Sequence, residues 1–182
     1  MALQLEEIFR MHYASVLRAA FRITGSMADA EDVTQAIFLR LARGSLEDHA
    51  IRDMGSYLRR AAVNAALDLL RSHRIRPQVP IEEAFFPSHS QASPEQAQSS
   101  AELRRRLRQA LARLHPSTAE MFALRYVEGL DNPEVARIMH TSQAVVAVTL
   151  YRARSRLRKE LRAFATSEER LCLEKSTSSS IT

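Results

Sequence analysis

The chain has 182 residues, of which 46% are hydrophobic and 26% are charged, and its formal net charge is +5 at pH 7. This length allows one medium domain or two small ones of roughly 60 to 80 residues. Its four glycines form no GxG pattern, which excludes enzymes that hold a nucleotide on a P-loop or a Rossmann loop. The single cysteine excludes an internal disulfide and a thiolate metal site, and no apolar run reaches the roughly 18 residues of a membrane span. We therefore expect a cytoplasmic protein with no cofactor, no metal and no membrane insertion.

Basic residues gather in two blocks on either side of an acidic one. Residues 51–76 contain six basic and two acidic residues, residues 77–100 contain no basic and three acidic ones, and residues 101–163 contain 13 and six. Two basic blocks around an acidic gap indicate two separate contacts with a polyanion such as nucleic acid. For either block alone, the alternative is that its arginines only solvate helix faces.

The acidic gap is also where the composition changes. Four of the six prolines lie between positions 77 and 94, followed by glutamines and serines, and such a stretch favours neither helix nor strand. We interpret residues 77–100 as a linker between a first domain, 1–76, and a second, 101–163, with a polar tail over 164–182. The sequence thus predicts an all-α fold of two small helical domains joined by a flexible linker.

Hydrophobic periodicity predicts three helices before the linker, over about 4–24, 27–43 and 55–74. Gly25 ends the first, and Ser26 caps the second with Asp29 at the third position. The second helix turns an apolar stripe inward, and its other side presents polar groups above exposed apolar ones: Glu31, Asp32, Gln35, Phe38 and Leu39. This second side is typical of a docking surface, although its acids also simply favour a helix N-terminus.

The third helix has an inward stripe of Leu58, Ala62, Ala65 and Leu69. Its second stripe consists of Tyr57, Arg60, Asn64, Asp68 and Arg71. An aromatic ring, an amide and arginines on one helix can stack on, hydrogen-bond to and neutralise single-stranded nucleic acid. The alternative is that Tyr57 belongs to the core and Asp68 pairs with Arg71 on a solvated face.

The second domain is predicted to contain helices over about 101–114, 117–128, 132–139 and 143–161. Ser117 would cap the second of these, with Glu120 completing a capping box, and Asp131 would cap the third. A short helix, a turn from His140 to Ser142 and a second helix match the spacing of a helix-turn-helix, whose second helix enters the major groove. Arginines at every second position wrap the last helix and serve as phosphate contacts or solvated ends: Arg152, Arg154, Arg156 and Arg158.

Several segments resemble a known family in the same order along the chain. The string DAEDVTQAIF over 29–38 resembles a DAED-x-x-Q-x-x-F signature, and residues 57–71 resemble WL-(x)5-N-(x)3-D-(x)2-R. In the second half, LRYVEGL over 124–130, EVA over 134–136 and the residues over 146–154 resemble LRYxEGL, EIA and VxxxLxRAR. These are the motifs of RNA polymerase sigma factors of the sigma-70 family, extracytoplasmic-function (ECF) group.

The resemblance implies a transcription initiation factor, not an enzyme, that binds the RNA polymerase core enzyme, directs it to promoter DNA and helps to melt the duplex. An anti-sigma factor is an expected further partner. By position, the residues implied to contact the core polymerase are Asp32, Gln35 and Phe38. Those implied at the promoter's minus-10 element are Tyr57, Arg60, Asn64 and Arg71. Those implied at the minus-35 element are Gln143, Ala147, Thr149, Arg152 and Arg154.

Three positions depart from the family pattern. Tyr57 replaces the usual tryptophan, and His140 stands in the turn where glycine is frequent. Ala147, Val148 and Thr149 stand where polar or basic side chains usually meet base edges, and they cannot make a bidentate contact to guanine. We therefore expect weak sequence readout by the second domain, with affinity resting on phosphates and DNA shape. The alternative function is a stand-alone helix-turn-helix regulator whose first domain binds a ligand or dimerises.

Overall fold

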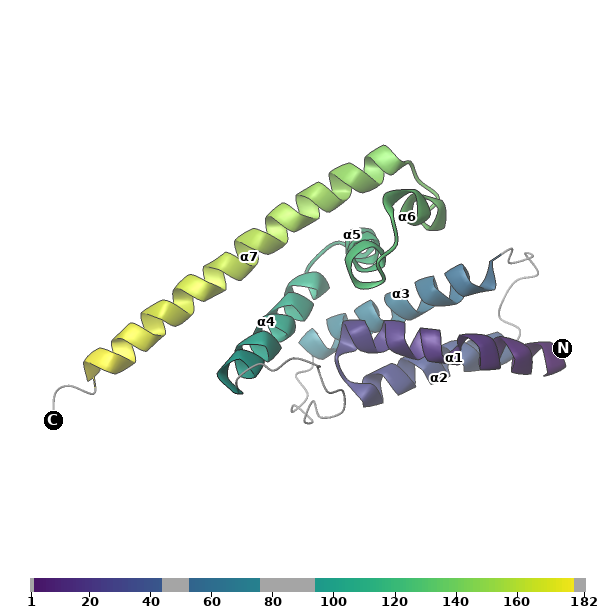
Figure 1. The fold of residues 1–182 in the computed structure, drawn as a ribbon, viewed down its shortest axis with the longest axis horizontal. Coiled ribbons are helices and arrows are strands. Elements are labelled where there is room, and N and C mark those ends of the chain that lie inside the picture. Colours follow the sequence, from purple (N-terminus) through teal and green to yellow (C-terminus); the bar gives the residue numbers. More distant parts are fainter. Residues whose placement is uncertain (1, 44–52, 76–93, 179–182) are drawn as a thin grey trace.

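The computed structural model describes residues 2–43, 53–75 and 94–178, and these ranges are helical apart from short connections (Figure 1). The elements, in chain order, are α1 (Ala2–Thr24), α2 (Met27–Ala42), α3 (Met54–Ile75), α4 (Pro94–Ala112), α5 (Pro116–Phe122), the π-helical turn η1 (Ala123–Val127), α6 (Asn132–Ile138) and α7 (Gln143–Ser178). The described ranges contain no strand, which confirms the predicted all-α class. Most of the predicted linker, 77–93, lies outside them.

Helices α1, α2 and α3 pack on one another and enclose the first core. The turn between α1 and α2 forms as predicted, because Gly25 takes a left-handed φ of 73° and the Ser26 hydroxyl accepts a hydrogen bond from the Asp29 amide at 3.2 Å. Nine side chains form the buried centre of this core: Val16, Ala19, Ala20, Ala30, Val33, Ile37, Phe38, Leu58 and Ala62. The predicted inward faces of α2 and α3 both contribute to it.

Helices α4 to α7 form the second helical unit, with the predicted helix-turn-helix at α6 and α7. Asp131 caps α6 through a complete capping box: its carboxylate accepts from the Glu134 amide, and the Glu134 carboxylate accepts from the Asp131 amide, both at 2.8 Å. His140 adopts a φ of 51° in the turn, so the backbone conformation usual for glycine there is confirmed for a histidine. Ser142 then caps α7 by accepting from the Val145 amide at 3.3 Å.

Two predicted helix starts were wrong. α4 begins at Pro94, not near 101, because a proline in the first turn of a helix lacks only an N–H that would have no partner there. α5 begins at Pro116, and Ser117 does not cap it. The Ser117 hydroxyl instead lies 2.9 Å from Nδ1 of His115, and the Glu120 carboxylate bonds to the first domain. The expected capping box is therefore absent.

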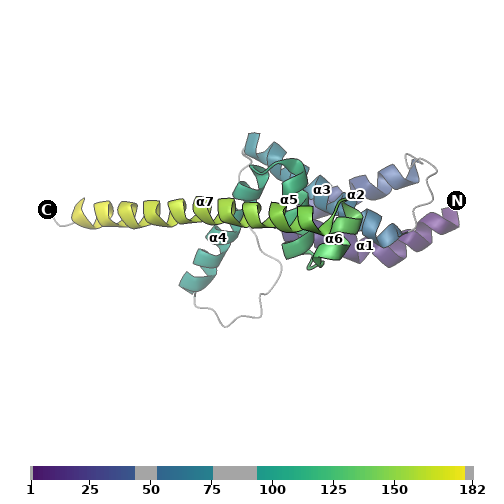
Figure 2. The same cartoon turned by 90° about the horizontal axis from the view of Figure 1, so that it is seen from above.

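The last helix is much longer than predicted. α7 continues to Ser178, through most of the segment predicted as a polar tail, and its last turns project away from the other helices (Figures 1 and 2). No glycine or proline occurs after Pro133, so nothing in the backbone chemistry stops this helix. Among the side chains that the structure describes, Val146, Leu150, Ala153 and Leu157 of α7 are buried against α4, α5 and α6.

The two helical units share a core across their junction. Ile23 of α1 and Val63, Ala66 and Leu67 of α3 are buried in one cluster with second-unit side chains such as Leu124. α3 therefore has two apolar faces: one is the predicted stripe toward α1 and α2, and the other, which we did not predict, lies against α4, α5 and α6. As a result the two domains are packed together in this structure.

Gly25 lies at this junction. A Cβ atom built there overlaps the guanidinium of Arg108 on α4, so only glycine leaves that side chain its place against the end of α1. Gly129 has a similar φ of 75°, but a Cβ at Gly129 meets nothing within 4 Å. Both glycines thus adopt the left-handed backbone conformation, but only at Gly25 would a side chain also meet a neighbouring residue.

We expect Gly25→Ala and Gly129→Ala each to lower the free energy of unfolding by about 1 kcal/mol, the cost of a side chain in the left-handed region. Gly25→Ala is expected to cost more, because its methyl group also displaces Arg108. Urea unfolding followed by circular dichroism measures both values. Equal unfolding midpoints for the two variants would show that the contact with Arg108 contributes nothing.

Candidate nucleic-acid and protein interfaces

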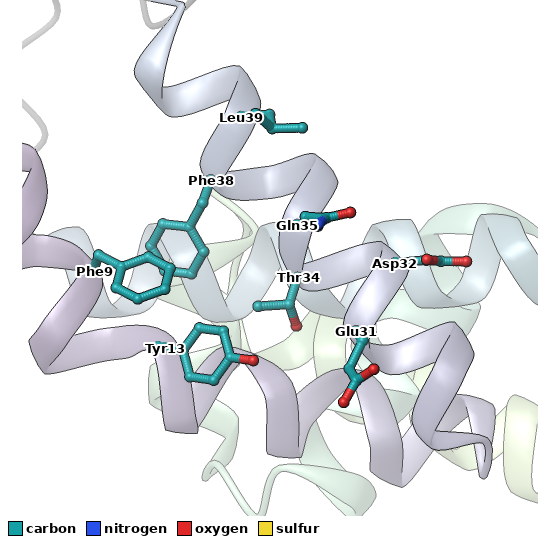
Figure 3. Close-up of a pocket in the computed structure, with 8 residues that line it drawn as sticks. All are labelled: Phe9, Tyr13, Glu31, Asp32, Thr34, Gln35, Phe38 and Leu39. Atoms are coloured by element: carbon teal, nitrogen blue, oxygen red, sulfur yellow. The ribbon is translucent and has the colours of Figure 1, made fainter.

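A pocket of about 530 Å³ lies between α1 and α2 (Figure 3). Three aromatic rings form one side of it: the Phe9 ring is 4.8 Å from Phe38, edge to face, and 4.9 Å from Tyr13, measured between ring centres. Phe38 is only 7% exposed, so its predicted exposure was wrong. Phe9 covers it and is itself 44% exposed, which makes Phe9 a surface residue that the motif on α2 alone could not reveal.

The other side of the pocket is polar. Glu31, Asp32 and Gln35 are exposed on α2, and in Figure 3 the side chains of Asp32 and Gln35 extend from the helix on the side away from the rings. Leu39 is 50% exposed at the same surface. The structure thus brings Asp32, Gln35 and Phe38 together, as predicted, around a hollow suited to a partner with apolar and basic groups.

Two of the predicted minus-10 residues on α3 face the second domain. The Arg60 guanidinium donates to the Glu120 carboxylate at 2.6 Å (Nε to Oε1) and to the backbone oxygen of Ile138 at 2.9 Å. The Asn64 amide donates to the same Glu120 oxygen at 3.0 Å. Glu120 is only 6% exposed, so its charge depends on these partners. Arg60 and Asn64 are therefore occupied by protein in this arrangement.

The other two minus-10 candidates follow the alternative interpretation. Tyr57 is half-buried against the first core, and Arg71 pairs with Asp68 at 2.6 Å on the surface of α3. The structure thus does not gather the four predicted residues on one open face. Tyr57 and Arg71 are held locally, whereas Arg60 and Asn64 are held by the second domain.

Further ion pairs cross the same junction. Glu128 lies 3.5 Å from Arg22 and 4.0 Å from Arg59, and Asp53 lies 3.4 Å from Arg137. Hydrogen bonds from the Ser56 hydroxyl and amide, with a smaller contribution from Arg137, lower the pKa of Asp53 to about 2. The acids at this junction were not predicted, because their partners across it lie at least 56 positions away along the chain, where no local spacing indicates them.

The predicted minus-35 residues lie on the first turns of α7. Gln143, Ala147, Arg152 and Arg154 are exposed, and Thr149 is half-buried. Three apolar side chains that are not among the five residues implied at the minus-35 element are also exposed on this stretch: Val145 at 48%, Val148 at 50% and Tyr151 at 75%. The surface is thus apolar at its start and basic farther along.

Within the described ranges, no group of three or more His, Cys, Asp or Glu side chains could hold a metal ion. No described helix is both long and apolar enough to cross a bilayer.

Two family models match the chain. Residues 8–75 match the model of sigma-70 region 2, and residues 104–157 match that of sigma-70 region 4. The two models therefore cover the first three helices and the helix-turn-helix, in the order that the motifs predicted.

Curated relatives agree with both models. The chain is 30% identical to the RNA polymerase sigma-E factor of Streptomyces coelicolor over 161 residues, which cover 87% of this chain and 86% of that one. It is 31% identical to the ECF RNA polymerase sigma factor SigE of Mycolicibacterium smegmatis over 157 residues, covering 86% of this chain but 61% of that one. Two other relatives are likewise longer, and the chain spans 56% and 38% of their lengths.

Solved structures show the same fold. The sigma factor RpoE from Bartonella quintana, crystallised with the anti-sigma factor NepR, aligns with 87% of this chain and 97% of its own length, with a TM-score of 0.50 and 19% identity. Taken with the motifs, both matched regions and the curated relatives, these findings confirm the resemblance. The chain belongs to the extracytoplasmic-function group of the sigma-70 family of RNA polymerase sigma factors.

Proposed function

We propose that this chain acts in the cytoplasm as a transcription initiation factor and not as an enzyme: it binds the RNA polymerase core enzyme, brings it to promoter DNA and assists in opening the duplex. The observation that carries this proposal is that regions 2 and 4 both match, in order, on one chain that also has the helix-turn-helix and the α2 pocket. A stand-alone regulator would have no need of the first of these regions.

The proposed contact with the core enzyme is the pocket between α1 and α2. Asp32 and Gln35 supply polar groups at its rim, and Phe38 with Phe9 supplies the apolar floor. Buried aromatic anchors inside a polar rim are typical of specific protein interfaces. Phe9, Asp32 and Gln35 are exposed in the structure in which the two domains are packed together, so this surface is open while the domains are in contact.

The proposed contact with the melted minus-10 strand uses Arg60 and Asn64, supported by Tyr57 and Arg71. A guanidinium can stack on a base or bind a phosphate, and an amide can bind a base edge. Because Glu120 holds both Arg60 and Asn64, DNA has to compete with Glu120 for the same donors. Binding of the minus-10 strand at these donors therefore requires the second domain to move away from α3.

The proposed contact with the minus-35 duplex uses α7, through Gln143, Ala147 and Thr149 toward the bases and Arg152 and Arg154 toward the phosphates. This division follows the geometry of helix-turn-helix domains, in which the start of the second helix meets base edges. An anti-sigma factor is proposed as a further partner, since a relative of the same fold was crystallised with one.

A charge reversal at the pocket tests the contact with the core enzyme. We expect Asp32→Arg with Gln35→Ala to weaken binding to purified core polymerase at least about 30-fold, since it puts a cation where a carboxylate meets the partner. Fluorescence titration of the labelled full chain measures the affinity. Glu7→Arg is the matched control, because Glu7 is exposed on α1 outside the pocket. Equal losses in both variants, or none in either, would refute this docking surface.

Salt dependence tests the phosphate contacts of α7. If four to six basic groups neutralise phosphates, log affinity for a minus-35 duplex should fall with log salt at a slope of roughly −4 to −5. Replacing Arg152 and Arg154 by alanine should make that slope shallower by about 2. Ser155→Ala, an exposed neighbour on the same helix, should leave it unchanged. A slope that the double variant does not alter would remove both arginines from the DNA contact.

Glu120→Gln tests the competition between Glu120 and DNA. Removing this charge should weaken the contact with Arg60 and raise the affinity for a single-stranded minus-10 oligonucleotide about threefold to tenfold, equivalent to about 1 kcal/mol. Fluorescence anisotropy measures the affinity. Glu102→Gln is the control, because it changes the net charge equally and its partners, Arg105 and Arg106, lie on its own helix. A similar gain in both variants would indicate a general charge effect and contradict the competition.

A further inference from the structure

The first two turns of α7 present an unusual surface for a helix that meets DNA. Val145 and Val148 are about half exposed, Tyr151 is 75% exposed, and Ala144 and Ala147 are exposed between them. At 100° per residue, Ala144, Val148 and Tyr151 fall on one line along the helix, with Val145 and Ala147 on either side. Meanwhile Val146 and Leu150 point the other way into the core. The exposed face is therefore a continuous apolar strip.

This strip contains no charge of its own. No Asp, Glu, Lys or Arg occurs between Arg137 and Arg152, and Gln143 is the one amide at the start of the helix. Beyond the strip, Arg152, Arg154 and other exposed arginines follow on the same helix. A partner that complements this surface combines a dense negative charge with small apolar groups at its centre.

The major groove of duplex DNA has that combination. Its phosphates flank the groove, and the C5-methyl group of thymine is the apolar group that its base edges present there. Valine and alanine methyl groups can pack on a thymine methyl, but they offer nothing to the hydrogen-bonding groups of a G·C pair. An α-helix inserted in the groove meets base edges with its N-terminal residues, which is where the strip lies.

We propose that Val145 and Val148 select the minus-35 element of this chain by packing on thymine methyl groups, so that the second domain reads a thymine-containing site through apolar contact. This inference rests on the proposed function and adds the kind of DNA sequence that α7 takes. It also refines the expectation of weak readout, since each buried methyl group contributes only about threefold in affinity.

The test uses RNA polymerase core loaded with the full chain. Run-off transcription from a template library with a randomised minus-35 region identifies the preferred element, which should contain thymine at two or more positions. Replacing those thymines by deoxyuridine removes only the methyl groups and keeps every hydrogen-bonding group. Each replacement should lower holoenzyme binding about threefold, and replacement in the spacer DNA should have no effect.

Two variants test whether Val148 makes the contact with a thymine methyl group. Val148→Ala should bind thymine and deoxyuridine nearly alike at the position that Val148 contacts, because the shorter side chain no longer reaches that methyl group, whereas the effect at the position that Val145 contacts should remain. The variant should fold, since Val148 is half exposed and alanine favours a helix more than valine does. Leu103→Ala, which removes an apolar side chain that is 56% exposed on α4, should keep the full preference for thymine.

Three results would overturn the proposal: a preferred element of G·C pairs, an equal affinity for thymine and deoxyuridine templates, or a Val148→Ala variant that keeps the full deoxyuridine effect. Equal affinity for the two kinds of template would indicate that the apolar strip binds a protein partner instead of thymine. Failure to produce a transcript from any template would instead refute the proposed initiation function, so the two failures are distinguishable.

Discussion

The buried carboxylate of Glu120 is the contact on which the arrangement of the two domains depends. One of its oxygens accepts hydrogen bonds from both Arg60 and Asn64, so two donors of α3 and one acid of α5 satisfy one another away from water. Burying the Glu120 charge without partners would destabilise the packed arrangement, so the two domains have to pack with Arg60 and Asn64 next to this carboxylate. On separation, however, all three groups regain water, and this hydration offsets much of what the buried contact contributes. Such a contact orders the domains and still allows them to part.

The apolar side chains at the same junction determine how easily the two domains can separate. Val63, Ala66 and Leu67 form a second buried face on α3, in addition to the face that packs on α1 and α2. If the second domain moves away, these side chains meet water, and the lost burial of three such groups outweighs the loss of the ion pairs. Separation is therefore favoured when another surface covers this face of α3, which connects opening to the binding of a partner.

Features that depend on neighbouring residues, such as helix caps, could be predicted from the sequence. Features that depend on contacts between distant helices could not. The caps at Ser26 and Asp131 follow from neighbouring residues and were predictable, whereas the left-handed turn at His140 was expected only from the family pattern. Glu120 stands where a capping box needs it, yet its carboxylate accepts from an arginine 60 positions away, because the packing of α3 on α5 brings that guanidinium to it. The second apolar face of α3 and the cover of Phe9 over Phe38 likewise depend on helices remote in sequence.

The three proposed surfaces differ in whether the packed arrangement leaves them open. The pocket on α1 and α2 and the apolar strip on α7 are exposed, whereas Arg60 and Asn64 are covered by the second domain. In the proposed function, the core enzyme and duplex DNA can thus approach before the single strand can. A single strand exists only after polymerase has engaged the promoter. The surface of Arg60 and Asn64, which would bind that strand, is the one that the second domain covers until then. Covering it until then also limits binding of this basic chain to unrelated single-stranded nucleic acid.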